Sequence, residues 1–179
     1  MFEKIETGIH DCFILKPRLF SDDRGDFVKL FHDEAFKNLD LCDHFKEMYF
    51  STSLKGVIRG MHLQVPPEDH IKCVSCLNGM IYDVVVDLRK KSPTYGQHFS
   101  TILTGDSPKL LYIPKGLAHG FMALTNHTIF LNKTSSVYDP DCDDGIHWNS
   151  CGIDWPMEPA LVSEKDKNLP PLDKFESPF

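Results

Sequence analysis

The stretch "MIYDVVVDLRKKSPTYGQHFSTILTG", residues 80–105, is the clearest indication of fold class in this chain. Its two ends are short runs of β-branched, aromatic and other apolar residues, and its middle is rich in Lys, Pro and Gly. β-Branched and aromatic side chains favour strands, whereas Pro and Gly favour turns. The stretch therefore predicts two strands joined by a turn.

Similar short apolar runs continue on both sides of this stretch. They are "GVIRGMHLQ" (56–64), "IKCVSCL" (71–77), "KLLYIP" (109–114), "GFMAL" (120–124) and "TIFLNKT" (128–134). Short strands at close spacing, separated by turn residues, predict an all-β sandwich or barrel. The Asn78–Gly79 step predicts a hairpin turn. "HDEAFKNL" (32–39) predicts a short helix, and we expect the proline-rich segment 154–179 to wrap irregularly over the body.

Length, charge and cysteine spacing limit the class of protein. The 179 residues predict a single domain, 1–179, and the net charge of −7 argues against a nucleic-acid surface. No apolar run is long enough to span a membrane, and the acidic N-terminus lacks the apolar core of a signal peptide. We therefore expect a cytoplasmic protein. The six cysteines are expected to be free thiols, because Cys73 and Cys76 would face opposite sides of one strand.

Two histidines stand in predicted strands. Strict alternation in "GVIRGMHLQ" would place Arg59 and His62 on opposite faces, but a bulge at Gly60 would bring them to one side. The alternative is a core histidine with a surface arginine. His119, in "IPKGLAHGFMAL", follows a predicted turn, and a structural role is the alternative there as well. The residue two positions after His62 is Gln64, so the His-x-His pair of metal-binding barrels is absent, which counts against a metal site.

In combination, the segments resemble the dTDP-4-dehydrorhamnose 3,5-epimerase family, metal-independent cupins of deoxysugar biosynthesis. The matching segments, in order, are "KPRLFSDDRGDF", "SLKGVIRGMHLQ", Lys72, "GMIYDVVVDLRKKSPTYGQ", "LYIPKGLAHGFMAL", "KTSSVYDPDCDDGIHW", "GIDWP" and "SEKD". The resemblance implies a cupin jelly-roll barrel with short flanking helices and no cofactor. It also implies a homodimer with exchanged N-terminal strands, and a nucleotide-diphosphate 4-keto sugar in the barrel mouth.

The resemblance also implies roles for individual residues. His62 matches the base that removes a proton next to the C4 ketone, Asp166 matches its carboxylate partner, and Lys72 matches the cation that stabilises the enolate. Arg24 matches a diphosphate contact that would lie in the partner's site. The other expected substrate contacts are Arg59, Gln64, His119, Tyr138, Asp143 and Lys165.

The chain departs from the family at the position of the acid. The family has a tyrosine in "F-L-Y-K-T" that returns a proton to carbon, whereas this chain has Asn132 in "FLNKT". An amide is not an acid near neutral pH. Three explanations are open: a water oriented by Asn132 delivers the proton, another phenol such as Tyr138 or Tyr49 does so, or epimerisation is restricted to one carbon or lost.

A second departure concerns the nucleotide base. Lys29 stands where the family commonly has a glutamate, and "EMY", Glu47 to Tyr49, stands where the family has "Q-D-N". Such replacements alter base preference, so dTDP, CDP and GDP sugars all remain candidates. We expect an epimerase acting at C3, C5 or both, in surface polysaccharide precursor synthesis. The alternatives are a nucleotide-sugar 3,4-ketoisomerase and a non-catalytic cupin that binds nucleotide sugars.

Overall fold

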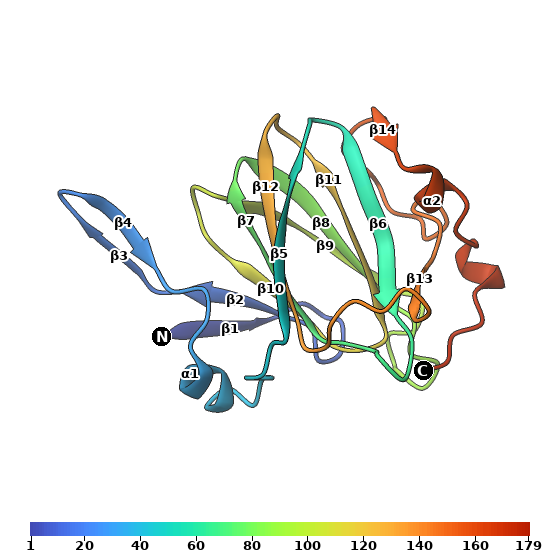
Figure 1. The fold of residues 1–179 in the computed structure, drawn as a ribbon, viewed down its shortest axis with the longest axis horizontal. Coiled ribbons are helices and arrows are strands. Elements are labelled where there is room, and N and C mark those ends of the chain that lie inside the picture. The colour runs from blue at the N-terminus through green and yellow to red at the C-terminus, as the bar shows by residue number, and fades with distance from the viewer.

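The computed structural model describes all residues, 1–179, and consists mainly of two facing β-sheets (Figure 1). The first sheet has the strand order β1 (Phe2–Glu6), β2 (Phe13–Pro17), β10 (Leu110–Ile113), β7 (Lys72–Asn78), β12 (Thr128–Thr134) and β5 (Glu47–Ser53). The second has the order β13 (Asp143–Gly145), β6 (Val57–Gln64), β11 (Leu117–Ala123), β8 (Met80–Asp87) and β9 (His98–Thr104). The short strand β14 (Leu161–Val162) runs parallel to β6. The predicted all-β jelly-roll barrel is confirmed.

The remaining elements lie outside these two sheets. The strands β3 (Leu19–Asp22) and β4 (Gly25–Val28) form a separate hairpin that projects away from the body (Figure 1). Three helical turns, α1 (Asp33–Lys37), α2 (Glu164–Lys167) and the 3₁₀ turn η1 (Leu172–Lys174), flank the sheets. None of the helices is long or apolar enough to cross a membrane.

The core follows from the alternation of side chains along the strands. Ile81 and Val85 of β8 face the first sheet and pack with Val74, Leu111 and Phe130. The intervening residues of β8 face the other way. Val84 and Val86 pack under the C-terminal segment with Ile146 and Ile153. The C-terminal segment is therefore a cover for the outer face of the second sheet, as expected of a segment that wraps over the body.

The seven predicted strands and the helix at residues 32–39 are present with small shifts at their ends. The prediction of a hairpin at Asn78–Gly79 is wrong, because β7 and β8 lie in different sheets and the turn carries the chain from one sheet to the other. All six cysteines are free, as expected, and Cys73 and Cys76 lie in different core clusters. The strands before residue 54 were missed because polar and charged residues interrupt their apolar pattern.

Candidate active site

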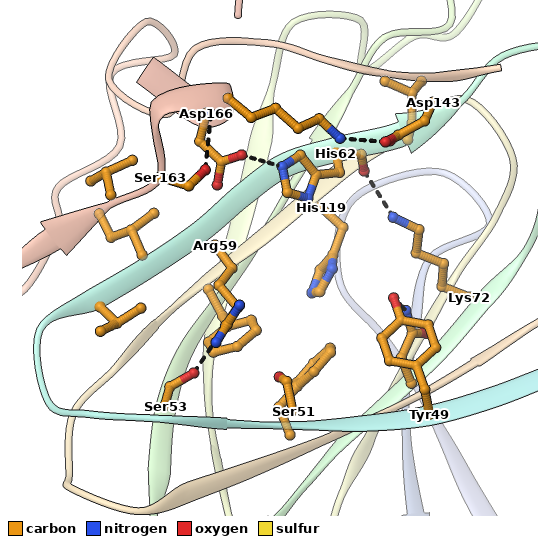
Figure 2. Close-up of a pocket in the computed structure, with 18 of the residues that line it drawn as sticks. Tyr49, Ser51, Ser53, Arg59, His62, Lys72, His119, Asp143, Ser163 and Asp166 are labelled. Atoms are coloured by element: carbon orange, nitrogen blue, oxygen red, sulfur yellow. Dashed lines mark hydrogen bonds and ion pairs between the residues drawn. The ribbon is translucent and has the colours of Figure 1, made fainter. Parts of the chain in front are cut away.

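A cavity of about 770 Å³ opens between the two sheets, beside the C-terminal segment. This volume lies within the range usual for small-molecule sites. The cavity brings together most of the residues that the sequence singled out. These are His62, Asp166, Lys72, Asn132, Tyr49, Arg59, Gln64, His119, Tyr138, Asp143 and Lys165. Residues spread over more than a hundred positions of sequence therefore share one site (Figure 2).

The predicted bulge in β6 is present. His119 of β11 pairs with His62 and Phe121 pairs with Arg59, so β6 has one residue more than β11 between these two pairings. Gly60, at this irregularity, has a φ of +136°, and a Cβ there would lie 2.5 Å from the Cα of Gly120. Only glycine fits such a position. The irregularity allows Arg59 and His62 both to line the cavity.

His62 and Asp166 form a hydrogen-bonded pair, with His62 Nε2 and Asp166 Oδ1 2.7 Å apart (Figure 2). The other carboxylate oxygen of Asp166 accepts the N–H of Gly60 at 3.1 Å. Burial by itself would raise the pKa of Asp166, but the hydrogen bonds and the charge of His62 hold that pKa below its ordinary value. The carboxylate therefore stays ionised and fixes the tautomer of His62, whose Nδ1 has no partner within the chain.

Local structure at the C-terminus positions Asp166. The strand β14 pairs with β6 and brings the chain to the cavity. Ser163 then caps α2, accepting the backbone N–H of Asp166 at 3.1 Å. Asp166 is only 3% exposed, although "SEKDKN" alone suggests a solvated helical turn. The helical turn is therefore present, but it presents one acidic residue inward.

Lys72 is a buried cation beside His62. Its Nζ donates to the backbone carbonyl of His62 at 2.9 Å. Burial lowers the pKa of Lys72 to about 8, from an ordinary value of 10.5. Most of the Lys72 side chains thus carry a positive charge at neutral pH. An ammonium group in such a place can stabilise negative charge that develops on a bound molecule.

His119 has its own carboxylate partner, which the sequence reasoning did not single out. The Nε2 of His119 lies 3.0 Å from Oδ2 of Asp83, and both side chains are almost fully buried. Asp83 Oδ1 has no hydrogen-bond partner. An aspartate within the apolar strand "MIYDVVVD" was the available signal, because a buried carboxylate needs a partner.

Hydrogen bonds within the protein use part of the Arg59 guanidinium but both ends of the Gln64 amide. Arg59 donates from Nε to Ser53 Oγ at 3.1 Å and from one terminal nitrogen to the Thr52 carbonyl at 3.2 Å. The Arg59 side chain also lines the cavity (Figure 2). Gln64 uses both ends of its amide within the protein, donating to the Glu68 carbonyl and accepting the N–H of Asp139. Gln64 thus fixes a loop at the cavity in this structure, and its expected contact with substrate stays a prediction.

A charged cluster lies at the rim. The Asp143 carboxylate pairs with Lys165 and accepts the hydroxyl of Tyr138 at 3.0 Å. Glu47 accepts the backbone N–H of Tyr138 at 2.6 Å, but it does not line the cavity. Glu47 therefore fixes the Tyr138 loop in this structure, and its expected contact with substrate stays a prediction.

Asn132 and Tyr49 face each other across neighbouring strands. They are paired in the register of β12 and β5, and Asn132 Nδ2 donates to the Tyr49 hydroxyl at 2.8 Å. Asn132 Oδ1 is buried and has no partner. The position of the expected acid is therefore occupied by an amide that contacts a phenol from the adjacent strand.

Two predicted contacts lie away from this cavity. Arg24 stands at the turn of the projecting hairpin, paired with Asp22, and Lys29 is exposed just after that hairpin. Neither lines the cavity of its own chain, so both stay predictions. Conversely, Ser51 and His70 line the cavity with polar atoms that lack partners. Burial and the charge of Lys72 lower the pKa of His70 to about 3, so its ring is neutral.

No group of three or more His, Cys, Asp or Glu side chains is placed to hold a metal ion. The cavity instead offers a histidine base with a carboxylate partner, a buried ammonium group and donors for anionic oxygens. This set of groups suits proton transfer at carbon next to a carbonyl.

Comparison with known proteins supports the resemblance seen in the sequence. The model of the dTDP-4-dehydrorhamnose 3,5-epimerase family matches residues 6–174. The dTDP-4-dehydrorhamnose 3,5-epimerase of Escherichia coli is 41% identical over 96% of this chain and 95% of its own length. Among solved structures, the Legionella pneumophila dTDP-6-deoxy-D-glucose-3,5-epimerase in complex with dTDP-4-keto-L-rhamnose superposes with a TM-score of 0.94 at 36% identity, covering 98% of this chain and 95% of that one.

A relative with a narrower activity is also similar. A 3'-monoepimerase from Streptomyces bikiniensis, in complex with dTDP-quinovose, superposes with a TM-score of 0.89 at 29% identity, covering 94% of this chain and 87% of that one. Similarity therefore extends to enzymes that act at one centre. The near-complete match of sequence and structure confirms the predicted isomerase class, and the chain belongs to the dTDP-4-dehydrorhamnose 3,5-epimerase family.

Proposed function

We propose that this chain epimerises a nucleotide-linked 4-keto-6-deoxyhexose at C3, C5 or both, in the synthesis of surface polysaccharide or other deoxysugar products. The observation that carries the proposal is the His62–Asp166 pair opening into a cavity with Lys72 beside it. Each group has one task in such a reaction. The names of the relatives support the substrate class, since several act on dTDP-linked sugars.

The geometry accounts for the first half of the reaction. A C4 ketone acidifies the hydrogens on C3 and C5. Nδ1 of His62 takes one of these protons, while Asp166 on Nε2 stabilises the imidazolium that forms. The electron pair of the broken C–H bond moves to O4 as an enolate, and Lys72 supplies a positive charge for that oxygen. A proton delivered from the opposite face then inverts the carbon.

We also propose that the chain is a homodimer in which the β3–β4 hairpin reaches the partner subunit. The hairpin projects from the body (Figure 1), and its apolar residues Leu19, Phe20 and Phe27 are exposed. Such apolar surface favours burial against another chain. Arg24, at the tip, would then supply a guanidinium for the diphosphate of a sugar bound in the neighbouring site. The cytoplasmic location stays a prediction from the sequence.

The test is proton exchange in D2O. The protein is incubated with dTDP-, CDP- and GDP-linked 4-keto-6-deoxy sugars, and the C3–H and C5–H signals are followed by NMR. We expect at least one signal to disappear and the His62→Ala variant to lose that exchange. If no substrate exchanges either proton, the epimerase proposal is wrong.

The same experiment separates the alternatives. A 3-keto product would indicate a 3,4-ketoisomerase, which also needs one well-placed histidine. Thermal stabilisation by a nucleotide sugar without any exchange would indicate a non-catalytic binding protein. The nucleotide sugar that gives the fastest exchange also identifies the preferred nucleotide. Lys29 and the Glu47–Tyr49 segment do not by themselves distinguish between dTDP, CDP and GDP.

A further inference from the structure

The wall of the cavity opposite His62 carries a phenol that has no assigned task. Tyr49 rises from β5 on the side of the cavity facing the His62–Asp166 pair (Figure 2). Tyr49, Ser51, Thr52 and Ser53 of β5 line the cavity, and Tyr49 is 46% exposed, whereas Met48 and Phe50 do not line it and are each 67% exposed. The strand register therefore fixes the direction of the Tyr49 side chain.

The hydrogen-bonding of Tyr49 leaves its proton available. The amide of Asn132 donates to the phenol oxygen at 2.8 Å, so this contact uses an acceptor position of the phenol and not its hydrogen. The Tyr49 hydroxyl donates to no group of the protein. The same Asn132 N–H would stabilise the phenolate left after the hydrogen has gone. Asn132 is 2% exposed and is held in the middle of the sheet, between β5 and β7.

The protonation state of Tyr49 also suits an acid. Burial is the main cause that raises its pKa above the ordinary value of 10, and the charges of Glu47 and Asp143 raise the pKa further. The hydrogen bond from Asn132 offsets part of this increase. The phenol is therefore protonated throughout the neutral range, as a proton donor must be before the reaction.

The other tyrosines are less suited. Of the five tyrosines, only Tyr49 and Tyr138 line the cavity. The hydroxyl of Tyr138 already donates its hydrogen to the Asp143 carboxylate at 3.0 Å, and Tyr138 sits in the charged cluster at the rim. Donation from Tyr138 to a sugar would leave Asp143 without this hydrogen bond.

We propose that Tyr49 returns the proton to carbon on the face opposite His62, with Asn132 as the residue that positions it. The inference rests on the proposed epimerase function. After His62 has taken the first proton, the O–H bond of Tyr49 breaks and its proton forms a new bond with the enolate carbon, using the electron pair of the enolate. The C4 ketone is restored and a Tyr49 phenolate remains. Solvent then returns a proton to Tyr49, and the His62 imidazolium loses one.

This arrangement amounts to an exchange of side chains between two neighbouring strands. In the resemblance described above, the phenol stands on the strand that contains residue 132, and an asparagine stands at the position of Tyr49. Here the phenol is on β5 and the amide on β12, at the same cross-strand pair. The pair therefore keeps both functional groups with their positions reversed.

The test compares exchange with inversion in three variants, Tyr49→Phe, Tyr138→Phe and Tyr95→Phe. Each removes one hydroxyl, and Tyr95, which lies outside the cavity, is the matched control. In D2O, NMR distinguishes deuterium gained with retention, which needs only His62, from deuterium gained with inversion. We expect Tyr49→Phe to lower inversion by about 10²- to 10³-fold and to keep exchange with retention within about tenfold. Tyr95→Phe should match the wild type in both.

The other possible results of this experiment contradict either the role of Tyr49 or the proposed function. Inversion at the wild-type rate in Tyr49→Phe overturns the inference, as does selective loss of inversion in Tyr138→Phe. Absence of exchange in the wild-type protein would instead refute the proposed function itself. A double variant, Tyr49→Phe with Asn132→Tyr, places the phenol back on β12 and should recover inversion at least tenfold over Tyr49→Phe. A folded double variant without recovery would contradict the idea that this cross-strand pair supplies the acid.

Discussion

Two histidines of the cavity, His62 and His119, each join Nε2 to the carboxylate of an aspartate, but the two pairs have different surroundings. His62 and Asp166 lie 2.7 Å apart, and the His62 side chain is 30% exposed. His119 and Asp83 lie 3.0 Å apart, and the His119 side chain is 6% exposed. Asp166 comes from the C-terminal segment, whereas Asp83 stands on the strand next to His119.

The difference shows that a hydrogen-bonded carboxylate does not by itself make a histidine a base. A base needs a nitrogen that substrate and solvent can reach, which the open ring of His62 provides. The His119 ring instead stacks against Phe130, with centroids 5.7 Å apart, and is enclosed between the sheets. We therefore infer that His119 forms a fixed wall of the site, while His62 transfers protons.

The largest effect is expected from replacing His62 by asparagine, with His119→Asn as the matched change in the other pair. His62→Asn should lower C–H exchange by about 10³- to 10⁴-fold, because it removes the ring that combines a carboxylate partner with a nitrogen open to the cavity. His119→Asn can keep a hydrogen bond to Asp83 and should lower exchange far less, with its main effect on KM. NMR exchange rates measured side by side check this. Equal losses in both variants would erase the distinction between the pairs.

The next effect concerns the carboxylates. Asp166→Asn should lower exchange by about 10²- to 10³-fold, since an amide neither fixes the reactive tautomer of His62 nor stabilises its imidazolium. Asp83→Asn, the matched change in the other pair, should lower exchange less than about tenfold. The comparison requires circular dichroism spectra showing that both variants are folded. An Asp166→Asn variant with nearly full exchange would contradict a role for the pair in catalysis.

The pH profile of kcat tests the role of Lys72, which contacts the His62–Asp166 pair but not the His119–Asp83 pair. Lys72 contacts the carbonyl of His62, and its pKa is lowered to about 8 by burial. The lysine is charged below that pH and loses its charge above it, so kcat should fall about tenfold per pH unit above pH 8. Lys72→Arg keeps its charge over this range. Whatever its absolute rate, its profile should show no such fall below pH 10.

The smallest effect on the exchange rate is expected for Asp83→Asn, whose main effect should be a lower free energy of unfolding. Asp83 is fully buried and one of its oxygens already lacks a partner. In Asp83→Asn the new amide hydrogens would be buried without acceptors, which costs about 1–3 kcal/mol of the free energy of unfolding. Urea unfolding measures this. Asp166→Asn, at the edge of the cavity, should lose less stability, and the reverse order would argue against the assignment of Asp83 as a structural partner.

Much of this site was predictable from the sequence, but unevenly. The short apolar runs predicted seven strands correctly, because alternation along a strand reflects burial on one face. The bulge at Gly60 was predictable because this glycine lies between Arg59 and His62 in a predicted strand. Asp83 was missed, since nothing in "MIYDVVVD" says which histidine it meets. The Asn78–Gly79 turn was assigned to a hairpin because local turn chemistry does not specify which sheet the next strand joins.

From the sequence, seven of the strands and the family could be predicted, and His62, Asp166 and Lys72 could be named as candidates for proton transfer. How these groups come together depends on the tertiary structure. Asp166 lies on a helical turn that looks solvated, and it reaches His62 only because β14 pairs with β6. Tyr49 meets Asn132 only through the register of β5 and β12. Local pattern encodes which side of a strand is buried, whereas contacts between residues distant in sequence depend on the order of strands in the sheets, which local pattern does not contain.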